Sequence, residues 1–343
     1  MSFLVRQVLI YAVPLMIVAL AGVFAERSGI INLALEGIMI FGAFIGVLFV
    51  RLIQQWGIFE LAFAEGNLLK LNLMMILCLL VCAIFGALFS LLLAFAAINL
   101  KSDQTIGGTA LNMLAPAIVL FLVRLITNQN KIEMVSGNTA ADWFMIKKTA
   151  LGFSKDNNSF FVNAFLDKVY PATYFCILLF IVLSIILYKT KFGLRLRSCG
   201  ENPQAAASLG INVFAMRYTG VVISGALAGI GGFVYAMTTA DCTANGDVAG
   251  FGFLALAVMI FGNWKPLNIS LGALLFGLFK CVAASYATLD INGDGVHMLA
   301  ELGINNNFYR LLPYLITLIV LAFTSKSSRA PKAEGIPYDP GRR

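Results

Sequence analysis

Charge is scarce in this sequence, and its scarcity excludes most classes of soluble protein. Only 12% of the 343 residues are Asp, Glu, Lys or Arg, whereas 60% are hydrophobic. A soluble domain has about 25% charged and about 45–50% apolar residues. No long segment has a soluble composition, so most of the surface must face lipid. We therefore expect an all-α polytopic membrane protein.

Several catalytic and metal-binding patterns are also missing. Histidine occurs once, at His297, and the six cysteines form no CxxC pair, which argues against His-based hydrolase sites, zinc knuckles and thiol redox motifs. The sequence has no GxxxxGK[ST] phosphate loop, HExxH or GxSxG motif, so we do not expect it to bind ATP or to be an enzyme. We expect no cofactor and no metal. The net charge of +7 is not clustered on a soluble module, which argues against nucleic-acid binding.

Eight apolar segments are long enough to span a bilayer, for which a helix needs about 20 residues. A ninth, 251–262, is too short at about 1.5 Å per residue, and we interpret it as half of a broken helix or a re-entrant segment. These segments predict a bundle of eight to ten crossings within a transmembrane domain, 1–325, followed by a tail, 326–343. The eight segments are 8–25, 30–50, 71–99, 105–126, 172–188, 218–239, 266–287 and 309–324.

The distribution of Lys and Arg orients the bundle, because cytoplasmic loops carry an excess of these residues. Loop 189–217 contains five basic side chains and one acid, and the tail is also basic, so both are predicted to be cytoplasmic. Loops 240–250 and 289–308 carry acids without Lys or Arg and are predicted to face outward. Alternation gives the remaining sides: outside for 51–70, the periplasmic loop 127–170 and the N-terminus, and inside for 101–103. Loop 127–170 is expected to be an ordered cap with a short amphipathic helix, or an irregular loop.

A short helix is encoded in full within loop 189–217. Asn202 is a preferred N-cap residue, Pro203 suits the first helical position, and Gly210 is placed for a left-handed C-cap. A helix of about two turns is marginal in water by itself. Its presence is explained if it docks into a groove on another protein; an ordinary structured loop is the alternative.

Polar residues also occur within the apolar segments. Asn32 and Glu36 lie four residues apart and therefore share a helix face. A carboxylate in an apolar segment marks a pathway or a buried partner. The candidate partners are Arg27, Asn112 and Arg124, and a structural hydrogen bond or ion pair between two helices is the alternative.

Further polar and small residues gather near the start of span 105–126. Thr109 and Asn112 follow two glycines there, which is compatible with a substrate-lining or gating position. The predicted substrate pathway therefore consists of Asn32, Glu36, Thr109 and Asn112.

Two GxxxG pairs, Gly42 with Gly46 and Gly225 with Gly229, predict close helix packing. Segment 33–42 also resembles segment 254–262, and the deduced topology allows the two to run in opposite directions. Inverted repeats are common in transporters, but apolar helices also match by chance.

Five runs of residues resemble the signatures of the branched-chain amino acid and ribose-type ABC permease family. Within that family they are most similar to the nucleoside (simple sugar-like) importer branch. The resemblance covers nearly the whole chain in order. The five runs are 26–37, 103–114, 192–212, 252–266 and 312–317.

The resemblance implies a multi-pass permease subunit in the inner (plasma) membrane, with a cytoplasmic C-terminus. Its implied partners are a cytoplasmic ABC ATPase, a second homologous permease in a heterodimer, an extracytoplasmic substrate-binding lipoprotein, and membrane lipid. It also implies that the short helix is the coupling element that enters a groove of the ATPase. The residues assigned to coupling are Arg195, Gly200, Glu201, Asn202, Pro203, Ala205, Ala206 and Gly210.

Other functions are compatible with the same residues. Within the family, the substrate could be a simple sugar or a branched-chain amino acid instead of a nucleoside. Outside it, an ion-coupled secondary carrier would also use an intramembrane glutamate such as Glu36. The long, Asn-rich loop 127–170 and the polar loop 289–308 leave open which binding protein would dock. A non-transport scaffold is disfavoured by the polar residues within the spans.

Overall fold

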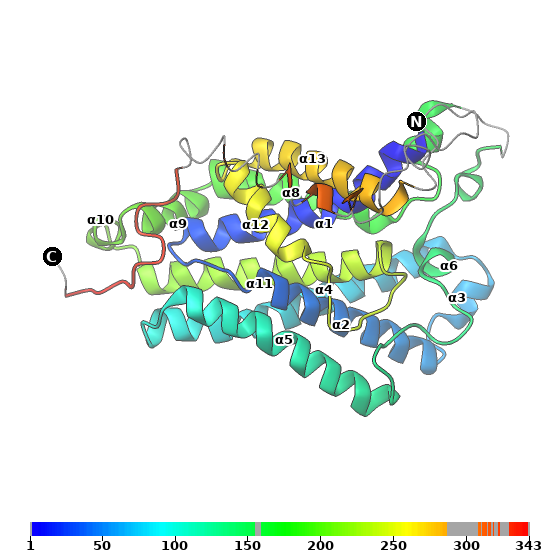
Figure 1. The fold of residues 1–343 in the computed structure, drawn as a ribbon, viewed down its shortest axis with the longest axis horizontal. Helices are drawn as coiled ribbons and strands as arrows, with labels where there is room; N and C mark the ends of the chain where they lie inside the picture. Colours follow the sequence, from blue (N-terminus) through cyan, green and yellow to red (C-terminus); the bar gives the residue numbers. More distant parts are fainter. Residues whose placement is uncertain are drawn as a thin grey trace.

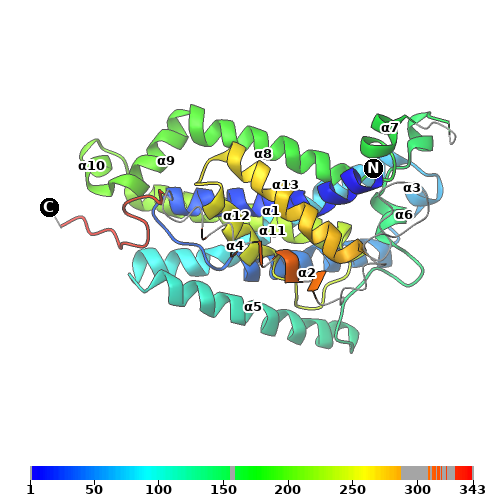
Figure 2. The same ribbon diagram turned by 45° about the horizontal axis from the view of Figure 1, so that its top comes forward.

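The computed structural model describes residues 2–154, 159–286 and 329–341, together with single positions between 308 and 322. These residues form an elongated bundle in which α5 lies along one side, α8 and α13 lie along the other, and α1, α2 and α11 lie between them (Figures 1 and 2). Seven of the described helices are long and apolar enough to cross a membrane. They are α1 (Ser2–Arg27), α2 (Leu35–Gln55), α4 (Leu68–Ala94), α5 (Gln104–Thr127), α8 (Pro171–Lys189), α11 (Val213–Thr238) and α13 (Pro266–Ser285).

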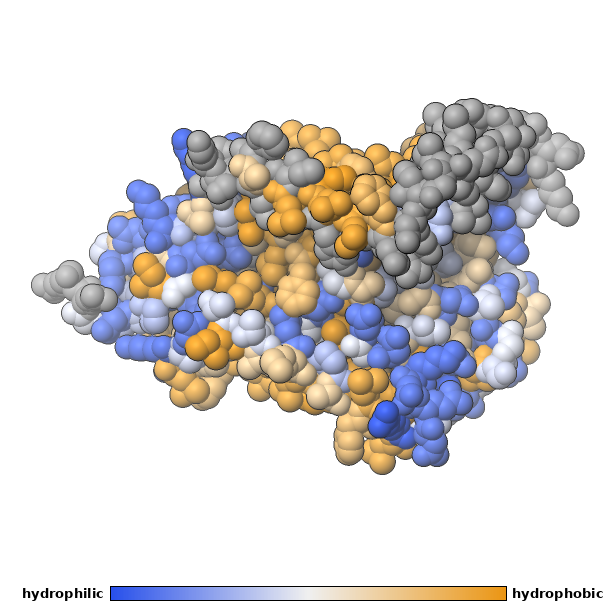
Figure 3. Space-filling view, in the orientation of Figure 1, coloured by the Kyte–Doolittle hydropathy of each residue, from blue (hydrophilic) through white to orange (hydrophobic). Residues whose placement is uncertain are grey.

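The bundle confirms the prediction of an all-α polytopic membrane protein. Seven of the eight predicted spans correspond to these helices, and α4 continues into a π-helical turn, η1 (Phe95–Asn99). The short apolar segment is the 11-residue helix α12 (Phe251–Phe261), which confirms that it cannot span the membrane alone. The predicted span 309–324 and loop 289–308 fall largely outside the described residues. Figure 3 shows hydrophobic surface over α13 and α5 and hydrophilic surface gathered over α9 and α10.

The predicted start of the second span, at residue 30, is wrong. The helix α2 begins at Leu35, and the backbone from 28 to 34 is non-helical. Gly29 has a φ of +98°, a conformation that glycine adopts without strain. Irregular backbone at membrane depth is tolerated only where protein buries it and satisfies its polar groups. Both conditions hold: Ser28, Ile30 and Asn32 are buried, and the side-chain oxygen of Gln104 accepts from the Ile31 N–H at 2.7 Å.

Glycines allow α11 to pack against α2 and α4 with backbone in contact with backbone. A Cβ on Gly42 of α2 would lie 2.5 Å from the carbonyl oxygen of Gly229 on α11. A Cβ on Gly229 itself would overlap the carbonyl oxygen of Cys82 on α4. A Cβ on Gly225 would overlap the side chain of Ser90. The GxxxG pairs therefore act in helix packing, as predicted.

The described loops gather at two ends of the bundle. The guanidinium of Arg6, near the start of α1, donates to the Asp167 carbonyl, and that of Arg51 donates to the Glu133 carbonyl. These contacts place the N-terminus and the end of α2 beside loop 127–170, and we call this the loop end. Opposite it lie the end of α1, the helices α9 (Lys191–Glu201) and α10 (Pro203–Ser208), and the tail 329–341, which together we call the coupling end (Figure 1). As predicted, the N-terminus lies on the same side as loop 127–170, and loop 189–217 lies on the same side as the tail.

Loop 127–170 is an ordered cap in the part that is described. It contains the short helices α6 (Ala140–Phe144) and α7 (Phe160–Phe165) and a 3₁₀ turn, η2 (Lys148–Leu151). The ring of Trp143 stacks on Phe63 of the neighbouring helix α3 (Glu60–Ala64), with 4.7 Å between ring centroids. The six cysteines of the chain are all buried and free, as expected for small apolar core residues.

The similar segments 33–42 and 254–262 run in opposite directions. Both α2 and α12 begin near Glu36. From there α2 runs to the loop end, whereas α12 runs to the coupling end, where Trp264 contacts Glu26. Each helix follows a long helix, α1 or α11, and a non-helical connection. This arrangement agrees with the inverted repeat that the sequence suggested.

A methyl group at Gly229 should weaken the bundle. The variant Gly229→Ala places a Cβ against the α4 backbone, which cannot move away without shifting a whole helix. Overpacking of this kind destabilises by about 1–3 kcal/mol. The matched control is Gly107→Ala, because a Cβ there meets only a Leu93 methyl group at 3.5 Å. Thermal unfolding in detergent should show a lower Tm for Gly229→Ala alone; equal Tm values would contradict the packing described.

Candidate functional site

Glu36 joins the starts of α2 and α12, the two helices that follow non-helical connections, and we call this point the junction. Glu36 lies in the first turn of α2 and is 6% exposed. Its carboxylate accepts hydrogen bonds from the backbone N–H groups of Gly250 at 3.0 Å, Gly252 at 2.6 Å and Phe253 at 3.2 Å. These groups begin α12 and have no partner within that helix. The carboxylate therefore caps α12, and the positive ends of both helix dipoles lie beside it.

Asn112 and Asn32 hold the non-helical segment 28–34 that precedes α2. The Asn112 amide accepts from the Gly37 N–H at 2.8 Å and donates to the Leu33 carbonyl at 2.7 Å. The Asn32 amide donates to the Ser224 hydroxyl at 2.8 Å and accepts from the Ala34 N–H at 3.1 Å. Each amide thus satisfies one backbone group of segment 28–34 and connects that segment to a helix, α2 or α11.

The structure brings three of the four predicted pathway residues together and separates the fourth. Asn32, Glu36 and Asn112 surround the helix junction, whereas Thr109 is exposed on α5 and its hydroxyl donates to the Thr105 carbonyl of its own helix. None of the partners predicted for Glu36 is shown bonded to its carboxylate. Arg27 pairs with Glu201, and Asn112 bonds to the N–H of Gly37, the residue after Glu36. Arg124 donates to Asn130. The pathway role of the four residues remains a prediction, and the geometry of three favours the structural alternative.

The polar loop 240–250, which is predicted to lie at the outer face, reaches the junction. The connection between α11 and α12 starts at the loop end, where Ala244 pairs with Ile132, and it finishes at Gly250 beside Glu36. Asn245 and Asp247 are exposed on this descending stretch. Exposed polar side chains this close to the junction are incompatible with a lipid-facing surface. The sequence signal was present in the acids of 240–250, but the depth of the loop was not predictable.

A cavity of about 380 Å³ lies next to the same loop. The ring of Phe251 packs against Tyr235, with 4.7 Å between centroids, and against Tyr11 at 6.5 Å. The ammonium of Lys280 lies 4.8 Å from the Phe251 ring centroid and donates to the Ala249 carbonyl at 2.9 Å. Aromatic rings with a few polar groups are typical of small-molecule sites. Among the described residues, no cluster of three or more His, Cys, Asp or Glu could hold a metal ion.

The coupling end contains the short capped helix that the sequence predicts. The Asn202 side chain accepts from the Ala205 N–H at 3.0 Å, Pro203 is the first residue of α10, and Gly210 has a φ of +79°. The cap-to-cap prediction is confirmed. Ala206 faces inward at 2% exposure, whereas Leu209, just after the helix, is 80% exposed.

An apolar groove of about 650 Å³ lies between α9 and the segment 209–216, which leads from the end of α10 into α11. Leu194 and Leu209 are exposed along it, and the predicted coupling residues Arg195 and Gly210 also line it. Large apolar side chains exposed at the end of the bundle mark an interaction surface more often than a solvated face. The helix α9 was not predicted as a separate element, although Thr190 caps it by accepting from the Gly193 N–H.

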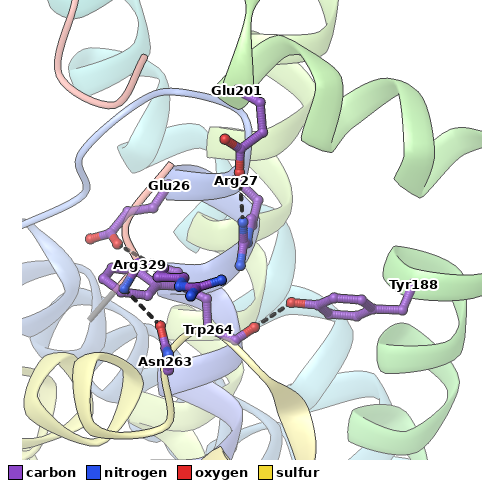
Figure 4. A network of polar contacts seen from close by, with 7 residues as sticks. All are labelled: Glu26, Arg27, Tyr188, Glu201, Asn263, Trp264 and Arg329. Atoms are coloured by element: carbon purple, nitrogen blue, oxygen red, sulfur yellow. Dashed lines mark hydrogen bonds and ion pairs between the residues drawn. The ribbon is translucent and has the colours of Figure 1, made fainter. Parts of the chain in front are cut away.

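Gly200 and Glu201 fix α9 to the end of α1, and Figure 4 shows the contact of Glu201 with Arg27. A Cβ on Gly200 would overlap the Arg27 carbonyl oxygen, and the Arg27 guanidinium pairs with the Glu201 carboxylate at 3.1 Å. The indole N–H of Trp264 donates to the Glu26 carboxylate at 2.5 Å, and Tyr188 donates to the Trp264 carbonyl. The ends of α1, α8, α9 and α12 are thereby tied into one network.

The electrostatics of this end are set by buried and basic groups. A cavity of about 730 Å³ is lined by Arg27, Lys265, Arg329 and Lys332, with Glu201 as its acid. Nearby, burial raises the pKa of the Glu334 carboxyl to about 7, and Arg27 opposes that rise. At the exposed loop before α5, the backbone N–H groups of Ile106 and Thr105 lower the pKa of the Asp103 carboxyl.

Comparison with known proteins places this architecture in a family. Residues 4–321 match the family described as the branched-chain amino acid transport system / permease component. The guanosine ABC transporter permease protein NupQ of Bacillus subtilis is 39% identical over 343 residues, which cover 100% of this chain and 98% of that protein. The nucleoside ABC transporter permease protein NupC of Lactococcus lactis is 38% identical over 338 residues, covering 98% and 97%.

No solved structure matches the chain significantly. The family match spans the described bundle from α1 to α13, including the junction, α9 and α10. The full-length relatives agree with it. The chain therefore belongs to the family of branched-chain amino acid transport system permease components.

Proposed function

We propose that this chain is the membrane-spanning permease subunit of an ATP-binding cassette importer for nucleosides. The observation that carries the proposal is the coupling end, where a doubly capped helix and an apolar groove lie exposed at one end of a membrane bundle. Two full-length relatives at 38–39% identity are named as guanosine and nucleoside permeases, which supports the substrate class.

In this proposal, α10 and the groove beside it receive the partner ATPase. The contact consists of Ala205, Leu209 and the groove residues Leu194 and Arg195, whereas the inward-facing Ala206 supports α10 from behind. Gly200, Glu201, Asn202, Pro203 and Gly210 give α10 its shape and its attachment to α9 and α1. Because the ATPase is cytoplasmic, the coupling end and the C-terminus face the cytoplasm, in agreement with the basic charge of 189–217.

The further partners follow from the same proposal. Lactococcus lactis has two nucleoside permease proteins named NupC and NupB, 38% and 24% identical to this chain, which supports a heterodimer with a second, related permease. The described part of loop 127–170, which caps the loop end, is the docking face for an extracytoplasmic substrate-binding lipoprotein.

The substrate path runs along the face that carries α5 and the connection 239–250 between α11 and α12. Gly246 of this loop lies against Leu120 of α5, so Asp247 and Asn245 share that face with Thr109. A nucleoside has no net charge and needs hydrogen-bonding groups along its path. Asn32, Glu36 and Asn112 lie behind this face and hold its shape. An ion-coupled carrier would leave the exposed groove beside α10 without a purpose.

A charge on the exposed leucine after α10 should disrupt ATPase binding. The variant Leu209→Arg places a cation in the apolar groove without touching the core, because this side chain is exposed. We expect the chain to insert normally while co-purification of the ATPase and ATP-driven uptake fall by about tenfold or more, as for loss of a central interface side chain. The control for ATPase recovery is Leu151→Arg, which places the same charge at the opposite end of the bundle and should leave the ATPase bound. Full ATPase recovery with Leu209→Arg would contradict the assignment of α10.

Uptake assays should identify the substrate class. Membrane vesicles that contain the assembled transporter should accumulate labelled guanosine when ATP is supplied, and excess unlabelled nucleosides should compete. Ribose and leucine should not compete, since they lack the base. Uptake that survives inactivation of the ATPase but collapses with an uncoupler would support an ion-coupled carrier instead.

Substitution of Glu36 and of Asp247 should distinguish a residue that supports the junction from one that lines the substrate path. Glu36→Ala removes the cap of α12 and should lower both uptake and Tm, because loss of an N-cap destabilises by about 0.5–2 kcal/mol. Asp247→Ala removes an exposed side chain and should change the KM for uptake with little change in Tm. An unchanged Tm for Glu36→Ala together with altered uptake would instead assign Glu36 itself to the path.

A further inference from the structure

Residues 329–339 of the tail contact the other elements of the coupling end, beside which the tail runs in Figure 1. At its start, the Arg329 N–H donates to the side-chain oxygen of Asn263, which follows α12, at 2.9 Å. The Ala333 N–H then donates to the Gly200 carbonyl at the end of α9, at 2.8 Å. The tail therefore connects the end of one discontinuous helix to the base of the α9–α10 element.

The middle of the tail lies on the break that precedes α2. The Gly335 N–H donates to the Gly29 carbonyl at 3.2 Å, and a φ of +74° at Gly335 brings the tail over Ile31. The next residue, Ile336, accepts from the guanidinium of Arg217 at 2.9 Å, and Arg217 is buried beside Gly29. One buried cation thus holds the tail and the break together.

The end of the tail reaches the coupling helix. The Tyr338 side chain, 9% exposed, packs in a cluster with Ala206 of α10 and with Cys199 and Val213. Its ring also meets Phe214 edge-on, with 5.3 Å between centroids. The amide of Gln204 donates to the Asp339 carbonyl at 3.0 Å. The contact with Ala206 comes from the inward side of α10, which leaves the exposed Ala205 and Leu209 free.

We propose that residues 329–339 form a strap that links α10 to the non-helical segment 28–34 and to the end of α12, and that passes the displacement of α10 to them. The proposal rests on the proposed function of α10 as the ATPase contact. The segment 28–34 has no regular helical hydrogen bonds, so it is a place where the bundle can change its backbone angles. A movement of α10 reaches this segment through Tyr338, Ile336 and Gly335.

Because of the strap, α10 does not need to contact segment 28–34 directly. The Arg27–Glu201 ion pair joins α9 to the end of α1, but neither of its residues belongs to the non-helical segment 28–34. The strap contacts the non-helical segment at Gly29 and Ile31, and Arg217 contacts it at Gly29. Tyr338 and Arg217 are therefore positioning residues for transport, and neither contacts substrate in this scheme.

The test compares two side chains of the strap in the assembled transporter in membrane vesicles. Tyr338→Ala removes the packing against α10, whereas the control Ile336→Ala trims a side chain that is 53% exposed and keeps the carbonyl bonded to Arg217. A third variant ends the chain after Ala330. Nucleoside uptake and ATP hydrolysis are measured together, and both are normalised to the amount of complex that contains the ATPase.

We expect Tyr338→Ala and the shortened chain to keep the ATPase bound and hydrolysing, while uptake per ATP falls by about tenfold, within the usual range for coupling between sites. Ile336→Ala should match the unaltered chain. Unchanged uptake per ATP in Tyr338→Ala and in the shortened chain would overturn the proposal, as would loss of the bound ATPase in them. Failure of the α10 assignment is distinguishable, because it would appear as normal ATPase recovery with Leu209→Arg.

Discussion

The hydrogen bonds from the first turn of α12 to the Glu36 carboxylate are the contact on which the rest of the bundle depends. Two helices begin at this level and run to opposite ends, so two sets of unpaired N–H groups meet within the bundle. In a bilayer such groups have no water to satisfy them. One carboxylate satisfies the start of α12, and the Asn112 amide satisfies the start of α2. The same helix ends stabilise the carboxylate, which would otherwise be unfavourable at this depth.

The close approach at this junction has steric requirements elsewhere. A Cβ on Gly252 would lie 2.5 Å from the Cα of Glu36, and a Cβ on Gly37 would lie 2.8 Å from the Leu111 carbonyl oxygen. Behind the junction, the glycines of α11 bring α2 and α4 equally close. The centre of the bundle is therefore built from backbone contacts, which leave little freedom for sliding. Larger rearrangements belong to the non-helical connections and to the coupling end.

Sequence reasoning succeeded where the signal is local. Hydropathy located the spans because burial in lipid acts on about 20 consecutive residues at once. The caps at Asn202 and Gly210 located α10 because each acts on its own turn. The break at 28–34 was missed because an apolar segment looks the same whether it is helical or extended and buried. The partner of Glu36 was missed because Gly250 is 214 positions away and contributes only backbone. The contacts of the tail are likewise mostly through backbone, with Tyr338 as the main side chain.

The six buried cysteines have a practical meaning for following motion in this protein. They are free of disulfides, so the fold does not depend on the redox state on either side of the membrane. Burial also raises the pKa of the Cys199 thiol near the coupling end, which keeps it in the unreactive protonated form. A single cysteine introduced at an exposed position such as Ile336 would thus be the main target of a thiol-reactive dye. Strap and coupling helix can therefore carry fluorescent reporters without first removing the native thiols.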